Sequence, residues 1–196
     1  MTGVLVTGFE PFGKNEVNPS ELIAEELGGV VLPVSYARAG GELQRALDER
    51  DPEIVIAFGL ADDRETITPE RFAHNLDEAT TTDNDEAPGS GEAIDPDGPA
   101  AYASSLPVDE LVEALRAEGI PAAPSRDAGG FLCNHVFYVL MRPLEQERPS
   151  ARGGFVHVPR LPEQALATDE PSMPLETLVR AAGVIVGTCA PQRSAS

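Results

Sequence analysis

One cysteine stands where a thiol could act as a nucleophile. Cys133 lies in the run AGGFLCNHVFYVLM, in which a glycine-rich turn leads into an apolar helix. The dipole and the free N–H groups at a helix N-terminus stabilise a thiolate, so we expect the pKa of this thiol to lie below its reference value of about 8.5. A buried, unreactive cysteine is an equally good interpretation of this segment taken alone.

A histidine and a glutamate are candidates to assist such a thiol. His157 lies in GGFVHVPRLPEQ, at the end of a predicted core strand and just before two prolines that stop the sheet. Strand ends carry functional side chains in open α/β folds, although a histidine satisfied within the core is the alternative. Glu70 lies in ITPERFAHNLDEA, in a predicted turn leading into a strand, where by itself it would be a solvated charge.

A glycine-bounded loop near the N-terminus nearly matches a phosphate-binding loop. The segment Gly8–Asn15, GFEPFGKN, follows a strand and precedes a helix. Asn15 replaces the hydroxyl that would hold magnesium, and Pro11 lacks a backbone donor, so we exclude nucleotide binding. Phe9 and Phe12 could instead wall a small apolar ligand at this edge of the sheet, with ordinary loop packing as the alternative.

The pair Cys133 and His135 suggests a metal site, but its spacing argues against one. Residues two apart on a helix diverge by about 200°, so their side chains do not ligate one ion from the same face. The chain has three histidines and no CxxC or HExxH pattern. We therefore expect no metal, and we interpret His74 and His135 as structural or exposed residues.

Alternating strands and helices must position these residues. The continuous apolar runs predict buried, largely parallel strands at Val4–Val6, Val30–Val34, Ile54–Phe58 and Gly154–Val158. Helical patterns occupy Pro19–Leu27, with Asn18 as N-cap, and Gly41–Arg50, Pro107–Glu118, Cys133–Glu145 and Pro174–Cys189. The alternation predicts an α/β fold, a three-layer α/β/α sandwich around a twisted, largely parallel mixed sheet, in one domain over residues 1–196. An acidic, Pro- and Gly-rich stretch from Asp77 to Pro99 is longer than most connections in compact domains.

The charge of the chain excludes polyanionic partners. The formal net charge is -19, from 33 acidic and 14 basic residues, and Lys14 is the single lysine among the basic ones. Such a surface repels nucleic acid and anionic membranes. Because few acidic proteins nearly abandon lysine, whose apolar stem would cover surface, we hypothesise adaptation to a high-salt cytoplasm.

The cysteine content and the hydropathy of the chain indicate its compartment. Cys133 and Cys189 are the two cysteines, far apart and without the density of a disulfide-stapled secreted domain, so we expect a reducing compartment. We interpret Cys189, within an apolar C-terminal helix pattern, as a packing residue. No apolar run approaches the roughly 18 residues that cross a bilayer, and the N-terminus lacks the pattern of a signal peptide, so we expect a cytoplasmic protein.

Four segments, taken together and in order, resemble one known family. GFEPFG with NPS, then ITPER, then FLCNHVFY, then GFVHVPRLPEQ are similar to the motifs of pyroglutamyl peptidase type I, over about Thr2 to Gln164. The resemblance implies a cysteine exopeptidase with Cys133 as nucleophile, His157 as general base and Glu70 as the acid that holds the imidazole.

The resemblance also implies a substrate and its contacts. The substrates would be peptides with an N-terminal pyroglutamate, and the assembly a homotetramer that needs no cofactor. Phe9 and Phe12 would flank the lactam ring, Asn18 would help to set their loop, and Leu132 would line the pocket beside the nucleophile.

The chain departs from the family pattern near the nucleophile. Where members commonly read EARIPDN, residues 78–84 read EATTTDN, which places Thr80 where the family has an arginine thought to assist near the thiolate. The usual GQAGGR and TAGTF are GLADDR at residues 59–64 and DAGGF at residues 127–131. A non-catalytic paralogue that keeps the lactam pocket is therefore the alternative function. A nucleoside-acting enzyme of similar architecture would need an anion-binding loop that we do not find.

Overall fold

Residues 3–166 and 171–190 are described by a computed structural model of the chain. A five-stranded sheet runs through its centre in the order β2-β1-β3-β7-β4. The four parallel strands are β1 (Val4–Phe9), β2 (Val30–Leu32), β3 (Ile54–Leu60) and β7 (Arg152–Val158). The edge strand β4 (Thr68–Pro69) is antiparallel to β7. The predicted mixed, largely parallel sheet is confirmed.

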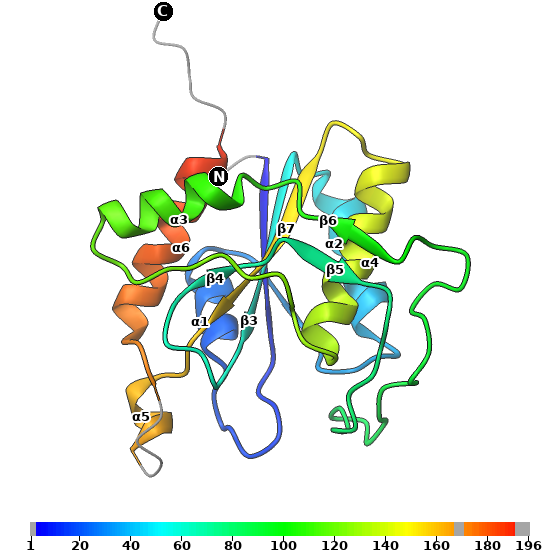
Figure 1. Cartoon of the computed structure of the whole chain (residues 1–196), viewed down its shortest axis with the longest axis horizontal. Helices are drawn as coiled ribbons and strands as arrows, with labels where there is room; N and C mark the ends of the chain where they lie inside the picture. Colours follow the sequence, from blue (N-terminus) through cyan, green and yellow to red (C-terminus); the bar gives the residue numbers. More distant parts are fainter. Residues whose placement is uncertain (1–2, 167–170, 191–196) are drawn as a thin grey trace, which may run out of the picture.

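Helices cover both faces of the sheet, which stands nearly edge-on between them in Figure 1. One face packs against α1 (Pro19–Glu26), α3 (Val108–Ala117) and α6 (Leu175–Cys189). The other face packs against α2 (Ala39–Arg50) and α4 (Leu132–Gln146). Two hydrophobic clusters, one on each side of the sheet, result from this arrangement, as expected for strands whose residues are apolar on both faces.

Local sequence accounts for where the helix next to the first loop begins. Asn18 is the N-cap of α1, and its side-chain oxygen accepts a hydrogen bond from the backbone N–H of Ser20. Pro19 follows in the first turn, where its missing N–H costs nothing. Both features match the prediction from sequence, and they fix the end of the loop that precedes this helix.

The structure adds short elements that the apolar patterns do not reveal. These are β4, the two-stranded sheet of β5 (Phe72–His74) with β6 (Ala101–Ala103), and α5 (Pro162–Ala165). Figure 1 shows β5 and β6 beside α4. Between them residues 75–100 contain no helix or strand, so the predicted long connection over Asp77 to Pro99 is present as a loop.

No described helix is long and apolar enough to span a membrane.

Candidate active site

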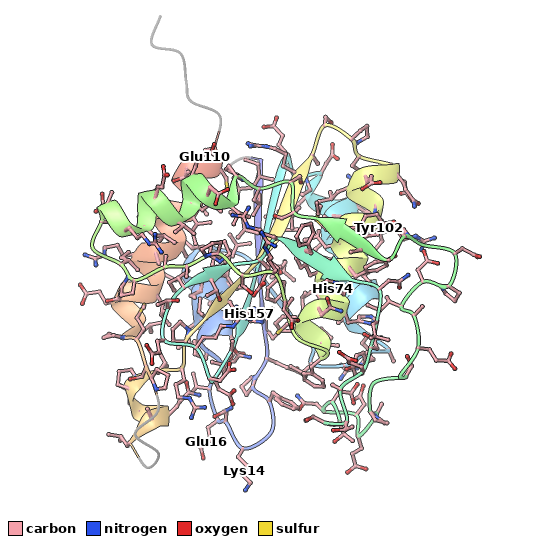
Figure 2. The ribbon with its side chains drawn as sticks, in the orientation of Figure 1. Lys14, Glu16, His74, Tyr102, Glu110 and His157 are labelled. Carbon is pink, nitrogen blue, oxygen red and sulfur yellow. The ribbon has the colours of Figure 1, made fainter. Side chains whose placement is uncertain are left out.

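The candidate site lies at the carboxyl ends of the central strands, beside the N-terminus of α4. His157 is the penultimate residue of β7 and is paired in register with Gly59 of β3. Cys133 lies in the first turn of α4, after a turn in which Gly129 adopts φ 80°, a conformation that favours glycine. Figure 2 shows His157 near the centre of the molecule. The fold thus brings the predicted strand end and the predicted helix start to one place.

Gly59 of β3, the register partner of His157, shows how closely the cysteine approaches the sheet beside the histidine. A Cβ atom built at Gly59 would lie 2.8 Å from Sγ of Cys133 and 2.7 Å from Cζ of Phe155. Phe155 and His157 are two residues apart on β7, so their side chains point to the same face of the sheet, with ring centroids 4.9 Å apart. Gly59 is the register partner of His157 on the neighbouring strand, about 4.8 Å away. The thiol over Gly59 therefore lies on the same face of the sheet as the imidazole, and close to it.

His157 and Glu70 form a buried pair. Nδ1 of His157 donates to Oε1 of Glu70 at 2.8 Å, and the two residues are 3 % and 0 % exposed. Glu70 follows the edge strand β4, and its backbone N–H donates to the carbonyl of Phe155 on β7. The hydrogen bond fixes the imidazole tautomer with its proton on Nδ1, which leaves Nε2 as the proton acceptor.

The same carboxylate oxygen accepts a second hydrogen bond, from an arginine. Nη1 of Arg64 lies 2.7 Å from Oε1 of Glu70 and 2.7 Å from Oγ1 of Thr68, and Nη2 donates to the carbonyl of Asp127 at 2.7 Å. The other carboxylate oxygen, Oε2, is buried and has no hydrogen-bond partner among the described residues. The carboxylate is therefore held through Oε1.

Burial controls the protonation states of the two reacting groups. Burial raises the pKa of the Cys133 thiol, and the nearby Glu70 carboxylate raises it further, while Arg64 opposes the shift. Burial also lowers the pKa of His157 below its usual value, against the opposing effect of Glu70. The expectation of a lowered thiol pKa was wrong, because desolvation of the thiolate outweighs the stabilisation offered by the helix N-terminus. Both shifts favour the uncharged forms, a thiol at Cys133 and an imidazole at His157.

The four residues predicted to contact a ligand all line one cavity. Its volume is about 410 Å³, and it is lined by Phe9, Phe12, Asn18 and Leu132, together with Cys133 and Phe131 among others. The rings of Phe12 and Phe131 pack with centroids 5.0 Å apart. The cavity is thus largely apolar and opens onto the thiol, as is typical of sites for small ligands.

Asn18 shapes this cavity through the backbone. Its Nδ2 donates to the carbonyl of Glu10, and its Oδ1 accepts from the N–H and the hydroxyl of Ser20. From the other side, Nε2 of Gln164 donates to the carbonyl of Val17 at 3.0 Å. The loop that carries Phe12 is therefore held where it leaves β1, through Glu10, and where it enters α1, through Val17.

The remaining histidines and the second cysteine have other surroundings. His74 is exposed, and Nδ1 of His135 donates to Oδ2 of Asp77 at 2.8 Å. Cys189 is 1 % exposed within the hydrophobic cluster beneath α6, and burial raises its pKa to about 11. Among residues 3–166 and 171–190, no three His, Cys, Asp or Glu side chains gather as a metal site would require.

The loop that contains Thr80 runs beside the turn before the nucleophile. The N–H of Ala79 donates to the carbonyl of Gly130 at 2.9 Å, and Thr80 itself is exposed. No arginine is available at this position. Two charged side chains influence the pKa of Cys133: the Glu70 carboxylate, which raises it, and the Arg64 guanidinium, which lowers it.

Three contributors to the site were missed by the sequence analysis: Gly59, Arg64 and Phe131. Arg64 keeps the last residue of the GQAGGR pattern, and that agreement was the available indication of its importance. The roles of Gly59 and Phe131 depend on strand register and on ring packing, which local sequence does not encode.

Comparisons with known proteins agree with this geometry. The family model described as pyroglutamyl peptidase matches residues 2–192. The pyrrolidone-carboxylate peptidase of Bacillus licheniformis is 45 % identical over 186 residues, covering 90 % of this chain and 86 % of the relative. The crystal structure of pyroglutamyl peptidase I from Bacillus amyloliquefaciens superposes with a TM-score of 0.93 at 41 % identity, covering 95 % of this chain and 93 % of the other. The pyrrolidone carboxyl peptidase of Thermococcus litoralis gives a TM-score of 0.92 at 41 % identity, with 96 % and 93 % covered.

Proposed function

Because this chain belongs to the pyroglutamyl peptidase family, we propose that it removes an N-terminal pyroglutamyl residue from peptides, with Cys133 as nucleophile, His157 as general base and Glu70 as its partner. One observation carries the assignment of residues. The buried His157–Glu70 pair lies beside a thiol that opens into a largely apolar cavity. These are the parts that nucleophilic acyl transfer requires.

The reaction begins with a neutral pair and forms a thioester. Nε2 of His157 accepts the thiol proton of Cys133 as Sγ attacks the carbonyl carbon that joins pyroglutamate to the next residue. The resulting tetrahedral intermediate expels the amine, which takes that proton from the imidazolium. Water, deprotonated by His157, then attacks the thioester and releases pyroglutamate and the free thiol. The Glu70 carboxylate stabilises the imidazolium in both steps.

The developing oxyanion needs a donor in place of the arginine that Thr80 replaces. The N–H of Cys133 lies in the first turn of α4, where backbone donors have no intrahelical partner and the helix dipole favours negative charge. This N–H is the donor that supports the oxyanion.

The cavity selects a lactam over an ordinary N-terminus. Phe9, Phe12 and Leu132 offer apolar surfaces to a flat five-membered ring that carries no charge. An α-ammonium group would lose its hydration in this cavity, which is unfavourable without a paired anion.

A chromogenic pyroglutamyl amide tests the function directly. We expect release of the chromophore by the purified protein, and no release from the matched prolyl amide, which has the ring but lacks the lactam carbonyl. The non-catalytic alternative, favoured by Thr80, predicts binding of 2-pyrrolidone by calorimetry without release of the chromophore.

We further propose the setting in which the enzyme works: one domain over residues 1–196, assembled as a homotetramer in a salt-rich cytoplasm. The two hydrophobic clusters share the strands of one sheet, which supports a single domain. Both cysteines are free thiols, which suits a reducing compartment. The tetramer follows from the resemblance to the family, and Leu166, 84 % exposed, is an apolar side chain available for a subunit contact.

Salt is expected to stabilise the protein. The net charge of -19 produces repulsion that is screened over about 10 Å at 0.1 M ionic strength and about 3 Å at 1 M. Raising KCl from 0.1 M to above 1 M should increase the melting temperature by about 5 °C, increase peptidase activity, and favour the oligomer, which should dissociate at the low end.

Thermal denaturation and light scattering across a KCl series measure this effect. An NaCl series at equal ionic strength is the control, since screening acts equally for both salts. A flat or falling melting temperature in both series would contradict the salt-adapted setting and leave the catalytic assignment untouched.

A further inference from the structure

The guanidinium of Arg64 reaches two segments that are distant from each other in sequence, one at β4 and one before α4. Arg64 lies in the turn after β3, where its backbone N–H donates to the carbonyl of Ala61. Its side chain donates to the hydroxyl of Thr68 on β4, to the carboxylate of Glu70, and to the carbonyl of Asp127 before α4. The planar fork of an arginine suits such divergent acceptors, whereas a lysine offers one nitrogen.

These contacts differ from those of an ordinary surface ion pair. The carboxylate partner is 0 % exposed, and the Arg64 side chain is 22 % exposed. Exposed ion pairs contribute little, because water screens them, but a fully buried acceptor leaves the cation as its main counter-charge. The guanidinium and the imidazole of His157 both donate to Oε1 of Glu70, so loss of one hydrogen bond changes the strength and geometry of the other.

We propose that Arg64 is a positioning residue for the proposed reaction, which orients the Glu70 carboxylate toward His157 and fastens the turn before Cys133 to that carboxylate. The inference rests on the proposed catalytic roles of Cys133, His157 and Glu70. It adds Arg64 to these three residues as a group that contacts neither the substrate nor the reacting atoms.

The connection to the nucleophile runs through the turn at Asp127. Its carbonyl accepts from Arg64, and its side-chain Oδ1 accepts from the N–H of Gly129 at 2.8 Å. Four residues after Gly129, Cys133 follows in the first turn of α4. Arg64 therefore connects Glu70, which holds the base His157, to the turn that precedes the nucleophile Cys133.

The cation also offsets the field of the carboxylate at both reacting groups. His157 faces Glu70, Arg64 and Asp63, and of these Arg64 lowers its pKa while the two carboxylates raise it. Cys133 faces Glu70 and Arg64, with the Tyr36 phenol also within electrostatic range. Glu70 alone would favour the imidazolium and disfavour the thiolate, and Arg64 moderates both effects.

The variant Arg64→Met removes the charge and keeps the length of the side chain. Activity requires a neutral imidazole, so it is lost as the pH falls through the pKa of His157. Loss of the cation raises that pKa, and we expect the acid limb of kcat/KM to move up by about one pH unit. Iodoacetamide should also label Cys133 more slowly at a given pH, because the thiol pKa rises as well.

Arg64→Lys separates charge from geometry. It keeps the cation but replaces the fork, so the acid limb should stay near its wild-type position while kcat falls about tenfold. Arg148→Met is the matched control: Arg148 is 21 % exposed, makes two ion pairs at 2.7 and 2.8 Å, and contacts Asp51 and Asp48, outside the site. Its acid limb should not move.

The outcomes distinguish the inference from the proposed function. An unmoved acid limb in Arg64→Met, or an equal displacement in Arg64→Lys, would overturn the positioning role while wild-type hydrolysis stands. If Arg64→Met does not fold, the Arg64→Lys profile and its labelling rate decide alone. Failure of the wild-type protein to hydrolyse pyroglutamyl amides would instead overturn the proposed function.

Discussion

Replacing Cys133 by alanine is expected to abolish hydrolysis of pyroglutamyl amides, with a loss of more than about 10⁴-fold in kcat/KM. The thiol is the group that forms the covalent intermediate, and no other cysteine lies near the cavity among the described residues. Because alanine keeps Cβ and favours the helix, the melting temperature should change little. Chromophore release and thermal denaturation of the variant measure the two effects.

Cys189→Ala is the matched control for this prediction. Cys189 is the last residue of α6 and its side chain lies in the core, so its replacement should lower stability slightly and leave kcat/KM intact. Iodoacetamide should label Cys133, which the cavity exposes, faster than Cys189, which is 1 % exposed. Activity that survives in Cys133→Ala, or is lost in Cys189→Ala, would contradict the assignment of the nucleophile.

His157→Ala should lose nearly all turnover, by about 10⁴-fold, because no other group takes the thiol proton. Glu70→Gln should retain roughly 10- to 100-fold more activity than His157→Ala, because glutamine still holds the imidazole but gives no charge stabilisation. Both Arg64 and His157 donate to Oε1, so the amide oxygen of glutamine takes that position and its NH₂ takes the position of Oε2. The tautomer of the imidazole is retained, and only the charge stabilisation of the imidazolium is lost.

Steady-state kinetics on the three proteins measure this ordering. Asn134→Ala is not a suitable control, since the buried Asn134 amide holds β5. Gln44→Ala is the control, because it changes a half-buried side chain of α2 that does not line the cavity. Wild-type turnover in His157→Ala would exclude this histidine as the base. A Glu70→Gln variant less active than His157→Ala would mean that the carboxylate does more than hold the imidazole.

The sequence predicted the large elements because their patterns are local. A window of about ten residues is enough to recognise the continuous apolar runs of β1, β3 and β7 and the capped start of α1. Strand β4 is two residues long, and β5 and β6 are three each. Such elements exist because of pairing with distant segments, so local sequence indicated only β5, as the strand expected after Glu70, and did not reveal β4 or β6.

The same division applies to the candidate site. Resemblance to a family indicated Cys133, His157 and Glu70, and the structure places the last two in contact. Arg64 was missed because its role appears only when β4, β7 and the turn before α4 meet. The direction of the thiol pKa was wrong because helix position is visible in sequence, whereas burial at the sheet is a property of the assembled fold.

The short antiparallel strand β4 also determines when activity appears during folding. It pairs with the outer edge of β7, and the Glu70–His157 contact beside it joins residues that are 87 apart in sequence. Because β4 has two residues, it has little stability of its own. Loop closure does not delay this contact relative to the central sheet, because the β3–β7 pairing of Ile54 with Arg152 also spans a long stretch of chain. The β4–β7 contact is the weaker of the two because β4 contributes only two residue pairs, whereas β3 contributes seven. A refolding chain can therefore regain its helices and central parallel strands while it is still inactive, and recovery of turnover reports the pairing at the sheet edge.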